Sequence, residues 1–178
     1  MPAAEEIHKN IPTKALELLS SISEIYAFNK KYFIKAEECM DTMDLFIAPL
    51  IEHRDALDHI MRYFNNIDKA DIKQLDKALG HEVRAFFDVA DYICINIRSS
   101  ISKNLEKMSP KKIQKIWSDY IKEKEKIRKI SDEIAQIRLE RSESKESVLN
   151  YIRILDEIFD LYNNYSINID PRIKISIN

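Results

Sequence analysis

A stretch of thirty residues in the middle of the chain, residues 72–101, repeats an apolar side chain every three or four positions. The series is Ile72, Leu75, Leu79, Val83, Phe86, Phe87, Ala90, Ile93, Cys94, Ile97 and Ile101. An α-helix returns to the same face about every 3.6 residues, so this spacing predicts one long amphipathic helix. Asp68 or Asp71 can cap its start. Gly80 falls inside the series, and we expect it to mark a close approach between helices rather than a hinge.

The same periodicity covers most of the remaining sequence. It predicts a helix over residues 13–47 that either runs unbroken or bends near Asn29, and a further segment that starts after Pro49 and ends near residue 66. Ser109-Pro110 has the order expected of a cap and a first helical residue. Two more series, with isoleucine prominent in the first, follow over residues 110–137 and 148–162. They indicate a long helical hairpin that resembles a coiled coil in the C-terminal third.

These series lead to one fold class. The chain has 178 residues with a single glycine and five prolines, which is too few for a fold with many β-turns. We predict an elongated all-α, up-and-down bundle of about five helices, formed as one domain by residues 1–165. Residues 166–178 alternate polar and apolar side chains and contain Asp170-Pro171. This predicts an extended or disordered tail that could dock on a protein partner, as could the C-terminal helices.

Charge and cysteine content restrict the classes of partner and compartment. The net charge of −2 names no partner by itself, but residues 111–129 hold eight Lys or Arg against three acids, a local excess of +5. That run predicts either a surface for nucleic acid or an acidic partner, or a solvated helix face with i,i+4 ion pairs, which we favour. Cys39 and Cys94 lack any metal-ligand spacing, which indicates buried free thiols. No apolar run reaches the roughly 18 residues of a membrane span, so we expect a cytoplasmic protein with no membrane partner.

The densest group of chemically active side chains lies in residues 51–62, with two histidines, two arginines and three carboxylates. We expect this helix to bury a face made of four apolar residues, Leu50, Leu57, Met61 and Phe64. Arg54 then falls at the edge of that face. One interpretation is purely structural, with Arg54–Asp58, Asp55–His59 and Asp58–Arg62 as i,i+4 pairs on a solvated helix.

The segment Arg54-Asp55-Ala56-Leu57-Asp58-His59 also resembles the short motif of the HEPN family, an arginine, a polar residue, three variable residues and a histidine. HEPN proteins are small all-α bundles, and many are metal-independent ribonucleases of toxin–antitoxin, phage-defence and CRISPR systems. The resemblance implies that Arg54 holds the scissile phosphate, that His59 is the general acid or base, and that Asp55 orients the site. It further implies RNA as the partner, a homodimer with two motifs facing one cleft, and no metal or cofactor.

Two alternatives remain open beside the ribonuclease. One is a non-enzymatic helical interaction or regulatory module, which would need an exposed apolar patch and would leave Arg54 and His59 paired with acidic neighbours. The other is a Mg²⁺-dependent nucleotide pyrophosphohydrolase, because the acidic pairs Glu38/Asp41 and Glu52/Asp55 resemble those of the MazG type. His81 lies on a polar stripe of the long central helix, where we expect a solvated face more than a second part of the site.

Overall fold

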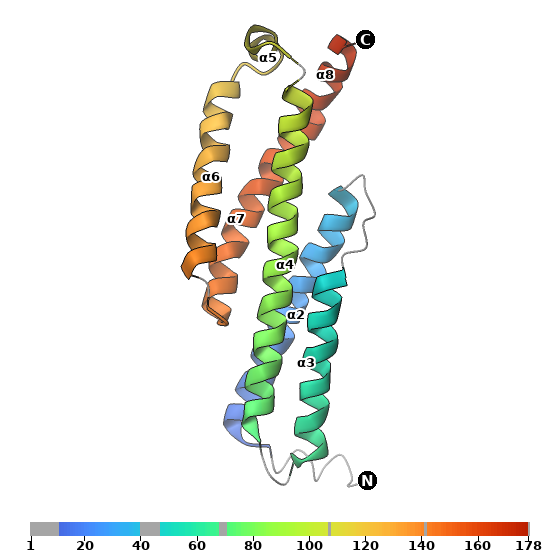
Figure 1. The fold of residues 1–178 in the computed structure, drawn as a ribbon, viewed down its shortest axis with the longest axis vertical. Coiled ribbons are helices and arrows are strands. Elements are labelled where there is room, and N and C mark those ends of the chain that lie inside the picture. The colour runs from blue at the N-terminus through green and yellow to red at the C-terminus, as the bar shows by residue number, and fades with distance from the viewer. Residues whose placement is uncertain (1–10, 40–46, 68–70, 107, 141, 178) are drawn as a thin grey trace. The chain divides into compact units, whose positions relative to one another are not determined.

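The computed structural model describes residues 11–39, 47–67, 71–106, 108–140 and 142–177. These residues form helices and connecting turns, with no strand among them, so the predicted all-α class is confirmed. They group into two compact units (Figure 1). The first unit consists of the chain up to Val89 together with Glu143–Val148, and the second of Ala90–Ser142 and Leu149–Asn178. The prediction of a single domain over residues 1–165 stays a prediction.

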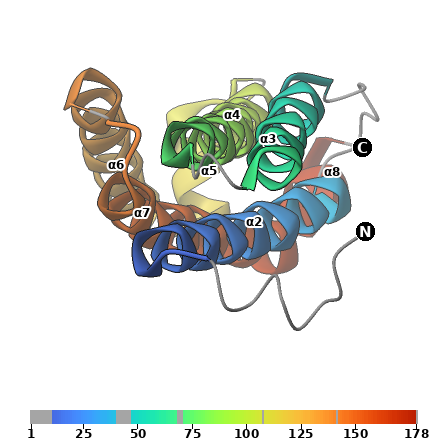
Figure 2. The same ribbon diagram turned by 90° about the horizontal axis from the view of Figure 1, so that it is seen from below.

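The first unit is built from α2 (Thr13–Cys39), α3 (Ile47–Asn65) and the first half of α4 (Ile72–Leu105). In an end view α2 lies across one side of both α3 and α4 (Figure 2). The helix α2 continues unbroken through Asn29, as the first of the two alternatives predicted. Pro49 stands in the first turn of α3, where its missing N–H costs nothing, and so the helix starts before it and not after it.

The orientation of α3 differs from the prediction. Its buried residues are Pro49, Ala56 and Tyr63, which are spaced seven apart. The four residues expected in the core are instead about half exposed: Leu50 50%, Leu57 54%, Met61 48% and Phe64 36%. Together with Ile47, at 52%, they form an outward apolar stripe along α3. Periodicity identifies an apolar face but does not say whether the core or a partner covers it, which is why the prediction was wrong.

The second unit contains the rest of α4, then α5 (Pro110–Ile116), α6 (Tyr120–Glu140) and most of α7 (Lys145–Asn164). Ser109 caps α5 as predicted, with its Oγ accepting a hydrogen bond from the backbone N–H of Lys112. The helix expected over residues 110–137 is broken at Trp117, whose side chain is buried and whose ring contacts those of Tyr120 and Tyr165. An Arg153–Glu133 ion pair joins α7 to α6, and coiled-coil packing of this hairpin stays a prediction.

The tail expected to be extended from residue 166 is helical up to residue 177. A π-helical turn, Tyr165–Ile169, continues α7 and leads into α8 (Asp170–Ile177). Tyr165, Ile169 and Ile173 are buried at steps of four, a helical spacing that the alternation of Ile173, Ile175 and Ile177 concealed. In the second unit Cys94 is a buried free thiol, as expected, whereas the side chain of Cys39 lies outside the described residues. No helix in the described ranges has the apolar length needed to cross a bilayer.

Candidate functional site

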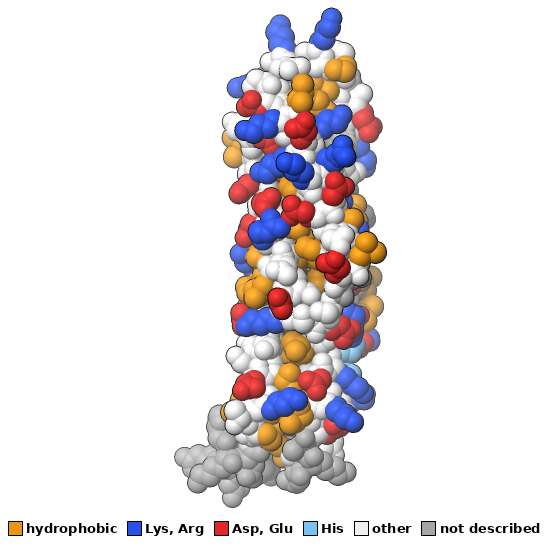
Figure 3. Space-filling view, turned by 90° about the vertical axis from the view of Figure 1, so that its left-hand side faces the viewer, with side chains coloured by type: hydrophobic (Ala, Val, Ile, Leu, Met, Phe, Trp, Pro, Cys, Tyr) orange, Lys and Arg blue, Asp and Glu red, His pale blue; other side chains and the backbone are white. Residues whose placement is uncertain are grey.

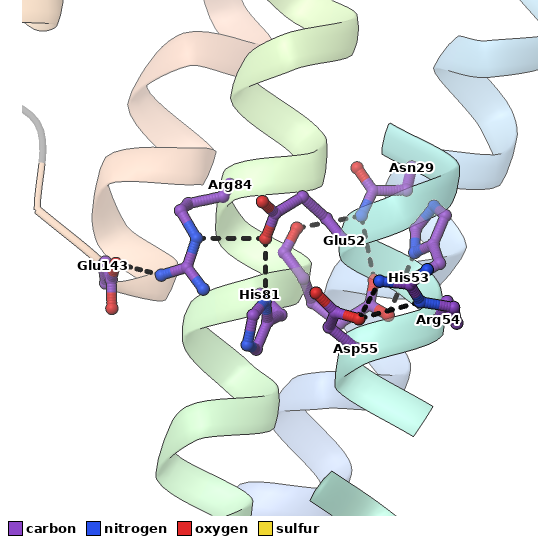
Figure 4. A network of polar contacts seen from close by, with 9 residues as sticks. Asn29, Glu52, His53, Arg54, Asp55, His81, Arg84 and Glu143 are labelled. Atoms are coloured by element: carbon purple, nitrogen blue, oxygen red, sulfur yellow. Dashed lines mark hydrogen bonds and ion pairs between the residues drawn. The ribbon is translucent and has the colours of Figure 1, made fainter. Parts of the chain in front are cut away.

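Two neighbouring residues of α3 pair with two neighbouring residues of α4 in opposite order. His81 donates from Nδ1 to Glu52 Oε2 over 2.8 Å, and His53 donates from Nδ1 to Glu82 Oε1 over 3.0 Å. A carboxylate oxygen accepts and does not donate, so Nδ1 carries the proton in both imidazoles. The result is a reciprocal pair of carboxylate–imidazole dyads inside the first unit (Figure 4). The mirrored dipeptides Glu52-His53 and His81-Glu82 are the sequence signal that would have predicted it.

The dyad of His53 and Glu82 is anchored in the core by α2. Asn29 is fully buried, and its Nδ2 donates to Glu82 Oε2 and to the backbone oxygen of Glu82, both over 3.0 Å. The Tyr26 ring meets His53 edge to face, with ring centres 5.6 Å apart. Glu82 is only 4% exposed, so these hydrogen bonds are what stabilise its carboxylate away from water. We therefore assign this dyad a structural role.

The dyad of His81 and Glu52 is nearer to solvent and extends to the segment before α7. Arg84 donates from Nε to Glu52 Oε2 over 3.0 Å and from Nη1 to Glu143 Oε1. Partial burial lowers the pKa of Arg84, but its hydrogen bonds with Glu52 and Glu143 outweigh that effect and leave the pKa raised. Gly80 lies against the side chains of Arg84 and Glu143, because a Cβ there would stand 2.5 Å from Glu143 Oε2. The prediction that Gly80 marks a close approach between two helices is therefore not borne out, since the nearest atoms belong to the side chains of Glu143 and Arg84.

The three residues of the HEPN-like motif lie beside the second dyad. Arg54 donates from Nε and Nη2 to Asp55 Oδ1 over 2.9 and 2.7 Å, and its own side chain is 72% exposed. The hydrogen bond from Arg54 lowers the pKa of the Asp55 carboxyl, desolvation opposes it, and the charges of Arg54, His81 and His59 lower it further. Figure 4 shows Asp55 between Arg54 and His81.

His59 completes this group. Its ring stacks on that of His81, with centres 5.3 Å apart and planes inclined by 26°. Its Nδ1 lies 2.8 Å from Gln74 Oε1, while Gln74 Nε2 donates to Asp71 Oδ2. Since the amide oxygen only accepts, His59 also carries its proton on Nδ1. In the neutral state the Nε2 atoms of both stacked imidazoles are then the basic nitrogens.

The i,i+4 pairs expected on a solvated helix form only in part. Asp58 and Arg62 do pair, at 2.6 Å. Arg54, however, pairs with its neighbour Asp55 and not with Asp58, and His59 turns to Gln74 and not to Asp55. More of the polar side chains of this stretch therefore pair with residues of α4 than the sequence suggested. Gln74, Asn29 and Glu82 were not identified from the sequence, and His81 was assigned there to a solvated face.

The acidic pairs of the pyrophosphohydrolase alternative do not gather in the described part of the chain. Glu52 accepts from His81 and Arg84, and Asp55 accepts from Arg54. Asp41 lies outside the described residues. Within those residues no three His, Cys, Asp or Glu side chains are placed to hold one metal ion. Because Asp41 is one of the four carboxylates, this alternative stays a prediction.

The basic run of residues 111–129 is divided between α5 and α6 in the second unit. Most of its lysines and arginines are exposed. The face that carries α6 shows blue and red side chains interspersed, with orange ones between them (Figure 3). The choice between a binding surface and a solvated helix face stays a prediction.

Comparison with protein-family models, with curated proteins and with solved structures finds no match for this chain.

Proposed function

We propose that the chain is a metal-independent endoribonuclease of the HEPN type, acting as a homodimer. The observation that carries this proposal is the single cluster formed by Arg54, Asp55, His59 and His81. Arg54 bonds to Asp55, His59 stacks on His81, and Asp55 lies between Arg54 and His81 (Figure 4), so a cation for phosphate and two imidazoles lie near one another in the first unit. Cleavage of RNA needs no more than these groups: charge stabilisation, one base and one acid.

The chemistry divides among these side chains as follows. Arg54 binds the scissile phosphate, since its bonds to Asp55 use two of its five N–H donors. His59, fixed through Nδ1 by Gln74, accepts the proton of the ribose 2′-hydroxyl on Nε2 as the 2′-oxygen attacks phosphorus. Protonated His81, stabilised by Glu52, donates a proton to the departing 5′-oxygen. The products are a 2′,3′-cyclic phosphate end and a 5′-hydroxyl end.

The exposed stripe on α3 supports the homodimer. Ile47, Leu50, Arg54, Leu57, Met61 and Phe64 follow one another at alternating steps of three and four. This is the spacing of the a and d positions of a coiled coil, with Arg54 near its middle. An antiparallel pairing of two α3 helices would cover the apolar residues of both copies. It would also bring the two Arg54 side chains close to the two-fold axis.

The test is cleavage of single-stranded RNA in the presence of EDTA. We expect the wild type to leave 2′,3′-cyclic phosphate ends, and Arg54→Ala, His59→Ala and His81→Ala each to lose the activity. Arg62→Ala is the matched control, because Arg62 is also an exposed arginine of α3, 60% exposed. Circular dichroism verifies that every variant keeps its helical content. A wild type that does not cleave, or an Arg54→Ala that cleaves like Arg62→Ala, would overturn the proposal.

A second candidate is a non-enzymatic interaction module that uses the same stripe. It is favoured by the half-exposed apolar side chains of α3 and by the pairing of Arg54 with Asp55. Here the stripe would bind another helical protein, and the histidine cluster would only hold α3 in place. Light scattering after size exclusion separates the candidates. The ribonuclease requires a dimer that Leu57→Asp dissociates with loss of cleavage, whereas the module predicts a stable monomer without cleavage.

A further inference from the structure

The second unit contains a cleft of about 500 Å³ between α4 and α6, and none of its lining residues belongs to the proposed ribonuclease site. Its volume lies within the range of roughly 300–1,000 Å³ typical of small-molecule sites. Arg98 of α4 bonds to Ser131 of α6 over 2.6 Å and fixes the two helices together at this cleft. All of its lining residues lie between Ile95 and Ser131, so the whole cleft belongs to the second unit.

The charge in this cleft has one sign. Three cations line it, Arg98, Lys124 and Arg128, and none of its described lining residues is Asp or Glu. These three cations form no ion pair among the described residues. Arg98 is also held in place, since its Nε donates to the backbone oxygen of Cys94 and its Nη1 to Ser131. A cation whose position is fixed in advance loses little entropy when an anion binds.

Four of the eight other lining residues are aliphatic, and the rest are Ser99, Ser102, Ser131 and Tyr120. The aliphatic ones are Ile101 and Leu105 of α4, Ile127 of α6, and Ile95, whose side chain is 47% exposed. An aliphatic wall gains most from burying a hydrocarbon chain, because the gain scales with the apolar area removed from water. Ile101 and Leu105 are already buried, so a wholly polar anion would leave mainly the exposed side chain of Ile95 in water, and a neutral hydrocarbon would leave the three cations without an anionic partner.

We propose that this cleft binds a single-chain amphiphile with an anionic head group, a carboxylate or a phosphate. The head group lies among Arg98, Lys124 and Arg128, and the alkyl chain lies along the isoleucines and Leu105. The proposal rests on the second unit alone and is independent of RNA cleavage.

Titration calorimetry of the full chain tests it with dodecanoate and dodecyl phosphate, each kept below its micelle concentration. These two probes distinguish a carboxylate from a phosphate head. Dodecyltrimethylammonium, a neutral dodecyl maltoside and adenosine monophosphate are the comparison ligands. We expect one or both anionic amphiphiles to bind at least about tenfold more tightly than all three comparisons. Equal binding of the cationic or neutral amphiphile, tighter binding of the nucleotide, or no binding of either anion would overturn the proposal.

Paired substitutions locate the site. Lys124→Gln with Arg128→Gln removes two cations from the cleft, and we expect binding to weaken at least about tenfold. Lys122→Gln with Lys129→Gln is the matched control, since both lysines are exposed on α6 and neither lines the cleft. The control should bind like the wild type. An equal loss in the two pairs would mean non-specific attraction to α6 and would also overturn the proposal.

Discussion

The buried contact between Asn29 and Glu82 predicts a large effect from a change of one atom. Asn29→Asp keeps the size of the side chain but replaces the donating Nδ2 with a carboxylate oxygen, about as far from Glu82 Oε2 as the present 3.0 Å. Glu82 is only 4% exposed and Asn29 not at all, so water cannot screen the two negative charges. An uncompensated buried charge costs about 3–5 kcal/mol, and we expect a loss of that order near neutral pH.

The pH dependence of this loss follows from the sign of the interaction. Two carboxylates that share a site raise the pKa of one of them, because a proton between them restores a hydrogen bond. Relative to the wild type, the variant is therefore penalised fully at high pH, and the penalty decreases as the pH falls and the shared proton binds. Asn29→Ala removes the donor without adding charge, so it should cost less, about 1–3 kcal/mol, with no such dependence.

Urea unfolding followed by circular dichroism, near pH 7.5 and near pH 5, measures these differences. The double variant Asn29→Asp with Glu82→Gln exchanges the roles of donor and acceptor. The amide nitrogen introduced at position 82 would donate to the new carboxylate, and the amide oxygen would accept from His53. We expect the double variant to recover about 2 kcal/mol relative to Asn29→Asp alone. If Asn29→Asp costs no more than Asn29→Ala, or if the two substitutions simply add, the reasoning is refuted.

Three further predictions follow from single positions. Gly80→Ala should leave the free energy of unfolding in urea unchanged or raise it by up to about 1 kcal/mol. Alanine has the higher helix propensity, and only the exposed end of the Glu143 side chain must move to make room. A loss above about 2 kcal/mol would contradict this. Tyr63→Phe should be neutral or stabilising by about 1 kcal/mol in thermal unfolding, since the buried hydroxyl has no hydrogen-bond partner among the described residues and burial raises the Tyr63 pKa. In a Cys39→Ser background, Cys94 should resist iodoacetamide at pH 8 until urea is added, because burial raises the pKa of its thiol to about 12; rapid labelling of the native chain would contradict its burial. The same shift implies a contribution to stability that is complete below the ordinary thiol pKa and is lost as the pH rises toward 12.

The sequence predicted the helices well because local spacing determines them, but it did not identify the buried polar contacts. Asn29 shows why. In the sequence it was considered only as the place of a bend in the first helix, although it occupies the same helical register as Ile22, Ile25, Tyr32 and Ala36. Its partner lies 53 residues away, so its role depends on which helices pack together. A polar residue in a core register predicts a partner without naming it.

The sequence named part of the candidate site but not the contact that completes it. Arg54, Asp55 and His59 were recognised from their order in the chain, and their grouping with His81 depends on how α3 packs against α4. Local propensity was also overridden at Trp117, where the burial of a large ring ends a helix that the isoleucine spacing would continue. In both cases the missing information is a tertiary contact between residues that are distant in sequence.

The rotation of α3 about its own axis links these observations. Turning it to bury Ile47, Leu50, Leu57, Met61 and Phe64 would remove the exposed half of each side chain from water, a gain of about 4–7 kcal/mol. The same rotation would withdraw His53 from Glu82 and leave a buried carboxylate short of a partner, at about 3–5 kcal/mol, and would separate Glu52 from His81 and Arg84 as well. It would also expose Ala56 and Tyr63, which are now buried, so the polar pairs and this apolar contact together hold α3 with its stripe outward. The apolar free energy that the monomer leaves unused is then available to whatever covers α3, and Arg54 stands in the middle of that surface.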